Sequence, residues 1–257
     1  MSKALEQIID EISQMEGKLG FYYKNLVTGE KAGFREKEEF LPASVVKLPL
    51  LMGMLLKESR GETDFNEKIL ICDSQKIPGC GAVQHMSGDV ELDIRTLYKL
   101  MIVISDNTAT NALLRHYGVA EMRESFLELG MAGTQFNREY YDFEKENRGI
   151  QNYFVPEELG ILLEKMYHRT LISPEASELL ESILLKQQIN HKLGGKLPED
   201  VPIAHKTGEE DHKTHDVGII YAKQPFVACF ASNDVDVPVF EDFIRRSALA
   251  LYQEANQ

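Results

Sequence analysis

Ser44 and Lys47 are the first residues whose types and spacing offer chemistry, because they place a hydroxyl and an amine three positions apart. On a helix, residues at this spacing lie on the same face. An amine in that position can take the proton of the hydroxyl if burial or a second cation lowers its pKa, and the hydroxyl oxygen then becomes a nucleophile. Taken alone, Ser44 also fits a helix N-cap.

Two tripeptides further along the chain complete an inventory for acyl transfer. Residues 105–107 read Ser-Asp-Asn, and residues 206–208 read Lys-Thr-Gly. They add a second hydroxyl with an amide, and a second amine with a third hydroxyl. Each has a plain structural alternative, a capping turn for the first and an exposed edge strand for the second. Both tripeptides are rare by chance, so their presence in this order favours a shared site.

These motifs and their flanks resemble those of class A β-lactamases and the related penicillin-recognising serine hydrolases. The flanks include Phe40–Ala43 before the first motif, Met101–Ile104 before the second and His205 before the third. The resemblance extends from about residue 18 to the end of the chain. It implies a hydrolase that opens β-lactam rings through an acyl-enzyme on Ser44, with Lys47 as the base.

The resemblance also implies roles for the remaining motif residues. Ser105 would relay a proton to the leaving nitrogen, and Asn107 would bind the substrate amide carbonyl and orient Lys47. On the third motif, the expected substrate-binding residues are Lys206, Thr207, Gly208 and Glu209. Lys206 would supply positive potential and Thr207 would contact a substrate carboxylate. The backbone N–H groups of Ser44 and Glu209 would form the oxyanion hole.

Two departures from the family pattern stand out. Class A enzymes carry a Glu-x-x-Leu-Asn loop whose glutamate activates the hydrolytic water, but here Glu139 is followed at the third and fourth positions by Asp142-Phe143. We expect Glu139 to be that base; the alternative is a solvated acid in an acidic loop. In addition, residues 209–211 are all acidic, which would weaken the attraction of a carboxylate substrate.

The order of the elements predicts an α+β fold. Helical periodicity covers residues 3–16, 93–104, 108–117, 119–129 and 238–254, and Pro156 and Pro174 each open a further helix. Strands are expected within 19–34 and at 201–207, 216–222 and 226–232, with a polar turn at 208–214. Residues 60–92 are expected to be loop-rich, and residues 131–155 are expected to form a long loop. The strands of both chain ends must pair into one antiparallel sheet flanked by the terminal helices, and the middle forms an all-helical lobe.

The expected boundaries are residues 1–42 and 187–257 for the sheet domain and residues 43–186 for the helical domain. Helix 43–55 is apolar on nearly all faces, so it belongs in the core, and Pro49 requires that it begin near Ser44. That start would direct the free N–H groups of the helix toward the reacting atoms.

Composition limits the partners of this chain. A formal net charge of -13 argues against nucleic acid and against an anionic membrane, and no apolar stretch is long enough to span a bilayer. We therefore expect a monomer that acts on a small molecule. Acidic residues interrupt the N-terminal segment, so no signal peptide is apparent and a cytoplasmic location is expected, or secretion if a leader was removed.

No metal or organic cofactor is expected. Three cysteines, an odd number, suit a reducing compartment and free thiols, although a local bridge between Cys72 and Cys80 is conceivable. The pair His212-x-x-His215 invites a metal interpretation, but surface histidines explain it better. Two other functions stay open: a cytosolic peptidase, amidase or esterase of the same fold, and a penicillin-binding or sensing module that is acylated without turnover.

Overall fold

The computed structural model describes all 257 residues. The helices are α1 (Lys3–Gln14), α2 (Lys47–Ser59), α3 (Ile94–Val103), α4 (Asn107–Tyr117), α5 (Val119–Glu128), α6 (Phe143–Asn147), α7 (Pro156–Tyr167), α8 (Pro174–Leu184) and α9 (Val237–Ala255). The strands are β1 (Lys18–Asn25), β2 (Lys31–Phe34), β3 (Lys68–Ile71), β4 (Val90–Asp93), β5 (Ile203–Glu210), β6 (Lys213–Ile220) and β7 (Phe226–Asn233).

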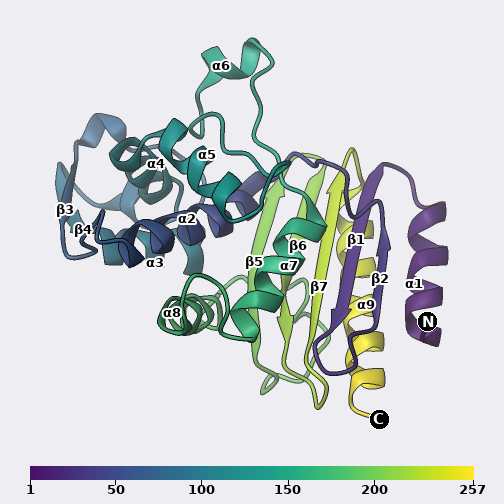
Figure 1. Ribbon diagram of the computed structural model, residues 1–257. Helices are drawn as coiled ribbons and strands as arrows, with labels where there is room; N and C mark the ends of the chain where they lie inside the picture. The colour runs from purple at the N-terminus through teal and green to yellow at the C-terminus, as the bar shows by residue number, and fades with distance from the viewer.

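The main sheet joins the two ends of the chain, as predicted. Its strand order is β2-β1-β7-β6-β5, and every neighbouring pair is antiparallel. β1 pairs along its whole length with β7, with Phe21 opposite Phe230. β5 is the edge strand nearest the helices of the middle segment (Figure 1). This α+β arrangement places the Lys-Thr-Gly motif of β5 where helices can approach it.

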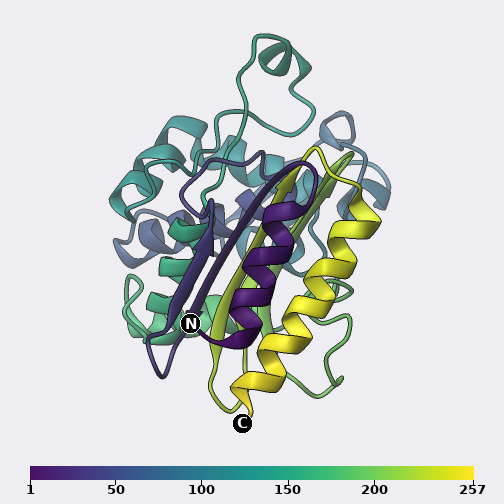
Figure 2. The ribbon, with the colours of Figure 1, turned by 90° about the vertical axis from the view of Figure 1, so that its right-hand side faces the viewer.

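Helices cover both faces of the sheet because its strands are apolar on both sides. Alternation along β1 sends Phe21 to the core beneath α1 and α9 and sends Tyr22 to the opposite core. Figure 2 shows α1 and α9 side by side on the first face. α7 packs on the other face, where Gly160 is required because a Cβ atom there would lie 2.3 Å from the Tyr22 ring.

The helical segment shares its core with the sheet. A single cluster of 43 buried residues extends from α2 to the side chains of β5, β6 and β7 on the α7 face. α2 is buried along most of its length, as its apolar pattern predicts. α7 packs on the sheet, although it falls within residues 43–186, the expected helical domain. The expected boundary residues 42 and 187 lie outside helices and strands. No helix combines the length and the apolar character needed to cross a membrane.

The structure refines one expected loop region and corrects two. The loop-rich residues 60–92 also supply β3 and most of β4, which form a two-stranded sheet, and residues 131–155, expected as a loop, contain the short helix α6. The turn expected at 208–214 is much shorter, because β5 continues to Glu210 and β6 begins at Lys213. Backbone pairing between β5 and β6 holds these polar residues in extended conformation, which their polar sequence does not reveal.

Candidate active site

Ser44 lies in a short 3-10 turn, η1 (Ala43–Val46), which leads directly into α2. Its side chain is partly exposed, while the residues on either side of it are buried. Ala43 has a φ of 43°, a left-handed conformation that non-glycine residues seldom adopt. Such strain persists only where the surroundings enforce it, and here it presents Ser44 at the protein surface.

Lys47, the first residue of α2, directs its amine back to Ser44. The Nζ atom donates to Ser44 Oγ at 3.0 Å, to Ser105 O at 2.6 Å and to Asn107 Oδ1 at 2.7 Å. The side chain is completely buried, and this burial lowers the pKa of Lys47 to about 7. Near neutral pH the amine is therefore partly unprotonated and able to accept the Ser44 proton.

The Ser-Asp-Asn turn between α3 and α4 aims two of its residues at Lys47 and uses the third to hold its shape. Ser105 has a φ of 58°, which turns the chain sharply at this point. Asp106 accepts the Ala109 N–H as the N-cap of α4 and accepts the N–H groups of Ala82 and Val83 at 2.7 and 2.9 Å. Asp106 thus ties the loop before β4 to the site without reaching the cleft itself.

Lys206 on β5 completes a continuous set of hydrogen bonds. Its Nζ atom donates to Ser105 Oγ at 3.0 Å, and the same oxygen lies 3.2 Å from Lys47 Nζ. Burial, and next the neighbouring Lys47, holds the pKa of Lys206 well below its ordinary value. One hydroxyl therefore connects the two amines, an arrangement through which a proton can pass.

Gly208 allows β5 to approach η1 closely. A Cβ atom at this position would lie 2.8 Å from Pro42 O and 3.0 Å from Val45 N. The contact places the backbone of the Lys-Thr-Gly strand beside Ser44. Thr207 and Glu209, on either side of Gly208, line the same cleft as Ser44 and Ser105.

Two adjoining clefts meet at Ser44, with volumes of about 650 and 520 Å³. The first lies toward β5 and the start of α9, and the second lies toward Asn107 and the 138–152 loop. The structure thus brings together eight of the nine residues expected from the sequence: Ser44, Lys47, Ser105, Asn107, Lys206, Thr207, Gly208 and Glu209.

Glu139 is the expected residue that the structure does not bring to Ser44. Its carboxylate lies 2.6 Å from the guanidinium of Arg115, which projects from α4, and its side chain lines neither cleft. An ion pair with Arg115 holds the carboxylate away from the reacting atoms. This geometry gives no support to the expectation that Glu139 activates a water.

Tyr140, the residue that follows Glu139, lies at the site. Its O–H donates to Ala43 O at 2.9 Å, and Lys47 Nζ lies 4.8 Å from its ring centre. Asn111 fixes its backbone by bonding both its N–H and its C=O at 3.0 Å. Burial raises the pKa of the phenol, so Tyr140 stays protonated.

The side chains of His212 and His215 lie in different environments. His212 is exposed in the β5–β6 turn, whereas His215 is buried and accepts the Ser232 N–H on Nδ1. Burial holds the pKa of His215 well below its ordinary value, in keeping with a neutral ring. His205 is also buried and shares a 2.8 Å hydrogen bond with Asp216. All three cysteines are free thiols.

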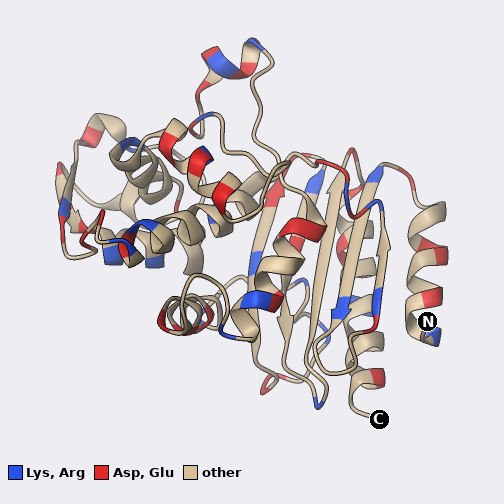
Figure 3. Ribbon diagram, in the orientation of Figure 1, with Lys and Arg blue, Asp and Glu red and all other residues tan.

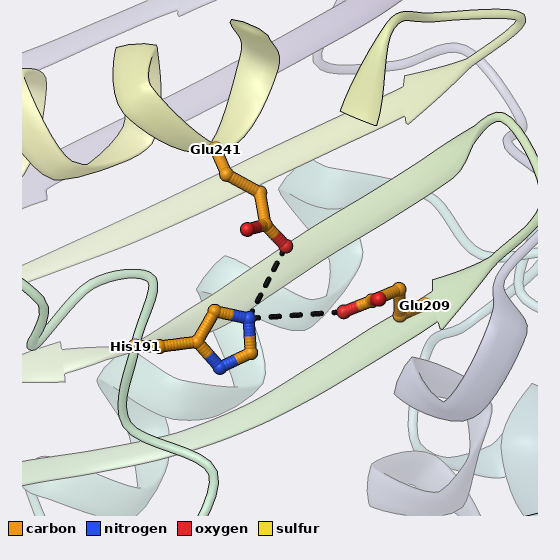
Figure 4. Close-up of side chains that lie close together, drawn as sticks. All are labelled: His191, Glu209 and Glu241. Atoms are coloured by element: carbon orange, nitrogen blue, oxygen red, sulfur yellow. Dashed lines mark hydrogen bonds and ion pairs between the residues drawn. The ribbon is translucent and has the colours of Figure 1, made fainter. Parts of the chain in front are cut away.

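One other group has the composition of a metal site. The potential ligand atoms of His191, Glu209 and Glu241 lie within 4.8 Å of one another (Figure 4). However, the buried Lys192 ammonium already lies 3.2 Å from Glu209 and 3.5 Å from Glu241. A metal ion would place its charge against that ammonium, so this group is built as an ion-pair network.

The whole chain matches a family model. Residues 2–255 match the model described as the beta-lactamase enzyme family. This chain belongs to that family. Among curated members, it is 25% identical to a beta-lactamase of Rhodobacter capsulatus over 256 residues, which cover 96% of this chain and 85% of the relative. It is 24% identical to beta-lactamase VEB-1 of Pseudomonas aeruginosa, over 69% of this chain and 64% of VEB-1.

Solved structures of the family share the fold. The structure of PBP-A superposes with a TM-score of 0.88 at 26% identity and covers 99% of this chain and 96% of that chain. A mutant of PBP-A, also 26% identical, has been solved as an acyl-enzyme complex with penicillin-G. The family membership and the α+β fold agree with the class A-like resemblance of the motifs.

Proposed function

We propose that this member of the beta-lactamase family is a serine hydrolase that opens β-lactam rings through an acyl-enzyme on Ser44. The observation that carries the proposal is the set of short hydrogen bonds from Ser44 through Lys47 and Ser105 to Lys206. It couples a partly exposed hydroxyl to an amine whose pKa burial lowers to about 7. The acyl-enzyme of the PBP-A mutant with penicillin-G is consistent with this chemistry.

The acylation step of the proposed reaction needs only groups that are present at the site. Neutral Lys47 takes the Ser44 proton as Oγ attacks the lactam carbonyl, and the C–N bond then breaks. Ser105 lies between Lys47 and Lys206, so it can pass a proton to the departing nitrogen. The backbone N–H groups of Ser44 and Glu209 would stabilise the oxyanion, each contributing about 2.7–4 kcal/mol in the transition state.

A second candidate is acylation with little turnover, or turnover only of acyl substrates other than β-lactams. The observation that favours it is the pairing of Glu139 with Arg115, while the protonated phenol of Tyr140 lies beside Lys47. A phenol that stays protonated cannot accept a proton from water, so Tyr140 cannot activate a water as a base. Deacylation would then be slow, and the acyl-enzyme would accumulate.

Hydrolysis of a chromogenic cephalosporin tests the proposal. Ser44→Ala should abolish both the initial burst and steady hydrolysis, because no nucleophile remains. Ser59→Ala, a serine exposed at the end of α2, is the matched control and should react like the unchanged protein. Hydrolysis that persists in Ser44→Ala would move the nucleophile elsewhere. A burst followed by negligible steady hydrolysis in the unchanged protein would select the second candidate.

A further inference from the structure

The clefts around Ser44 are lined by more carboxylates than cations. Five acidic residues contribute to their walls: Glu146, Glu209, Glu210, Asp211 and Asp236. Three cationic residues do so: Arg138, Lys192 and Lys213. Figure 3 shows acidic residues at the end of β5, where the sheet meets the helical segment. The charge at the mouth of the site is therefore negative, as is the charge of the whole chain.

Each of the three cations is already matched by a carboxylate. Arg138 lies 2.9 Å from Glu146, and Lys213 lies 3.2 Å from Glu210. Asp211 and Asp236 lie outside these pairs, although Asp236 also caps α9. An incoming anion would find no free cation along the walls and would have to break an ion pair to obtain one.

Lys192 is the cation best placed for an anionic substrate, and Glu209 occupies it. The ammonium is fully buried in the wall of the first cleft and donates to Gly208 O at 3.0 Å. Glu209 lies 3.2 Å and Glu241 lies 3.5 Å from this ammonium. Glu209 therefore neutralises the charge on which carboxylate binding beside Thr207 would depend.

The cations at the floor of the site do not compensate for these acids. Lys206 is fully buried, with Ser105 Oγ and its own strand's carbonyl as partners, and burial holds its pKa well below the ordinary value. Lys47 has a pKa of about 7 for the same reason. Lys47 therefore carries less than a full charge near neutral pH.

Two exposed aromatic rings add a surface that suits a cation. Tyr141 and Phe143 pack edge-to-face at 5.9 Å and line the second cleft together with Glu210 and Asp211. They are 42% and 61% exposed, so part of each ring is accessible from the cleft. Aromatic faces beside carboxylates attract quaternary ammonium groups.

We infer that the Ser44 site prefers acyl donors that carry a positively charged group, and that Glu209, Glu210 and Asp211 set this preference against carboxylate-bearing donors. The inference rests on the proposed function, since the charge of the donor can change the rate of Ser44 acylation only if Ser44 is acylated. Anionic β-lactams remain substrates, but poor ones.

Three matched cephalosporins provide the test: the free carboxylate, its methyl ester and its 2-(trimethylammonio)ethyl ester. They share one ring and one acyl side chain and differ in charge at a single position. Intact mass spectrometry follows the rate of Ser44 acylation by each. The cationic ester should react at least about 10-fold faster than the free carboxylate at low salt, and the ratio should shrink as salt is added.

Three variants test which acidic residues cause the preference for the cationic ester. Glu210→Gln/Asp211→Asn should reduce the cation-to-carboxylate ratio about 5- to 10-fold, since it removes two charges from the cleft wall. Glu209→Gln keeps its backbone N–H and should speed acylation by the free carboxylate, because it removes one of the two carboxylate charges beside Lys192 and leaves only Glu241. Glu6→Gln/Asp10→Asn changes net charge equally on α1, where both side chains are exposed, and should leave the ratio unchanged.

The outcomes separate the two claims. Equal rates for all three cephalosporins, or a ratio that Glu210→Gln/Asp211→Asn leaves unchanged, would overturn the charge preference while Ser44 acylation stands. A ratio that shifts equally in Glu6→Gln/Asp10→Asn would assign the effect to net charge and overturn the role of the cleft acids. If none of the three compounds labels Ser44, the proposed function fails and the charge preference fails with it.

Discussion

The residue that decides the chemistry is Lys47. Its amine contacts Ser44, Ser105 and Asn107 in a completely buried position. Burial penalises the ammonium, and its pKa falls to about 7, where an amine can serve as a base. The sequence predicted this role with burial or a second cation as the cause; burial is the dominant one, and the effect of a neighbouring cation appears on Lys206 instead.

The pKa of Lys47 predicts the pH dependence of acylation. Neutral Lys47 is the reactive form, so the rate of acyl-enzyme formation should rise with pH and level off above about pH 7. Each pH unit below that midpoint should slow acylation about 10-fold. Stopped-flow measurements of the burst against pH check this. A rate that is flat from pH 5 to 8 would remove Lys47 as the base.

Glu139 should be dispensable for deacylation. Its carboxylate pairs with Arg115 at 2.6 Å and lines neither cleft, so Glu139→Gln should leave both the burst and the lifetime of the acyl-enzyme within about 2-fold of their original values. Lifetimes are read from the decay of the adduct mass after excess β-lactam is removed. A lifetime that lengthens by about 100-fold would restore Glu139 as the water-activating base.

At the scale of elements, the site is an edge strand pressed against a helix start. β5 supplies Lys206 and Thr207, and η1 supplies Ser44; Gly208 is the residue that lets them touch. The Ser-Asp-Asn turn closes the third side through its left-handed Ser105. Three segments distant in sequence thus meet within hydrogen-bonding distance.

Gly208→Ala should disturb this contact. Its Cβ atom would lie 2.8 Å from Pro42 O, so β5 or η1 must shift, at a cost of about 1–3 kcal/mol in the free energy of unfolding. Displacement of β5 should also slow acylation by at least about 10-fold. Urea unfolding and burst kinetics measure the two effects. Normal acylation in a variant of normal stability would show that the close approach is not required.

Elements were predicted better than the loops that refine the site. The proline-initiated helices α7 and α8 and the strand β7 follow from caps and periodicity that are local in sequence. Residues 139–141 have no periodicity, so nothing local indicates which side chain faces Ser44. The long-range bonds from Asn111 to the Tyr140 backbone make that choice, and a tertiary contact of this kind is invisible in the sequence.

At the scale of the whole molecule, the sheet lies between two separate hydrophobic cores, and only one of them lies next to the site. The smaller cluster, of 21 buried residues, lies between the sheet and the terminal helices. The larger cluster, of 43 residues, lies between the sheet and the helical segment, next to Ser44. Both ends of the chain therefore stabilise a sheet whose opposite face and edge carry the chemistry (Figures 1 and 2).

Leu5→Ala should lower the stability of the protein without changing the rate of Ser44 acylation. Leu5 is fully buried in the smaller cluster, so its truncation should lower the free energy of unfolding by about 2–5 kcal/mol. The folded fraction should still acylate at the original rate, because α1 does not reach the clefts. Urea unfolding together with burst rates per folded molecule checks this. A proportional loss of acylation rate per folded molecule would show that the cores are coupled.

Acylation of Ser44 is tested by incubating the protein with excess benzylpenicillin and mapping the adduct. We expect a mass increase of one opened penicillin, located by peptide analysis on Ser44 and absent from Ser44→Ala. Persistence or decay of this adduct over time then separates slow from rapid turnover. An adduct on another residue, or no adduct in a folded protein, would refute Ser44 as the nucleophile.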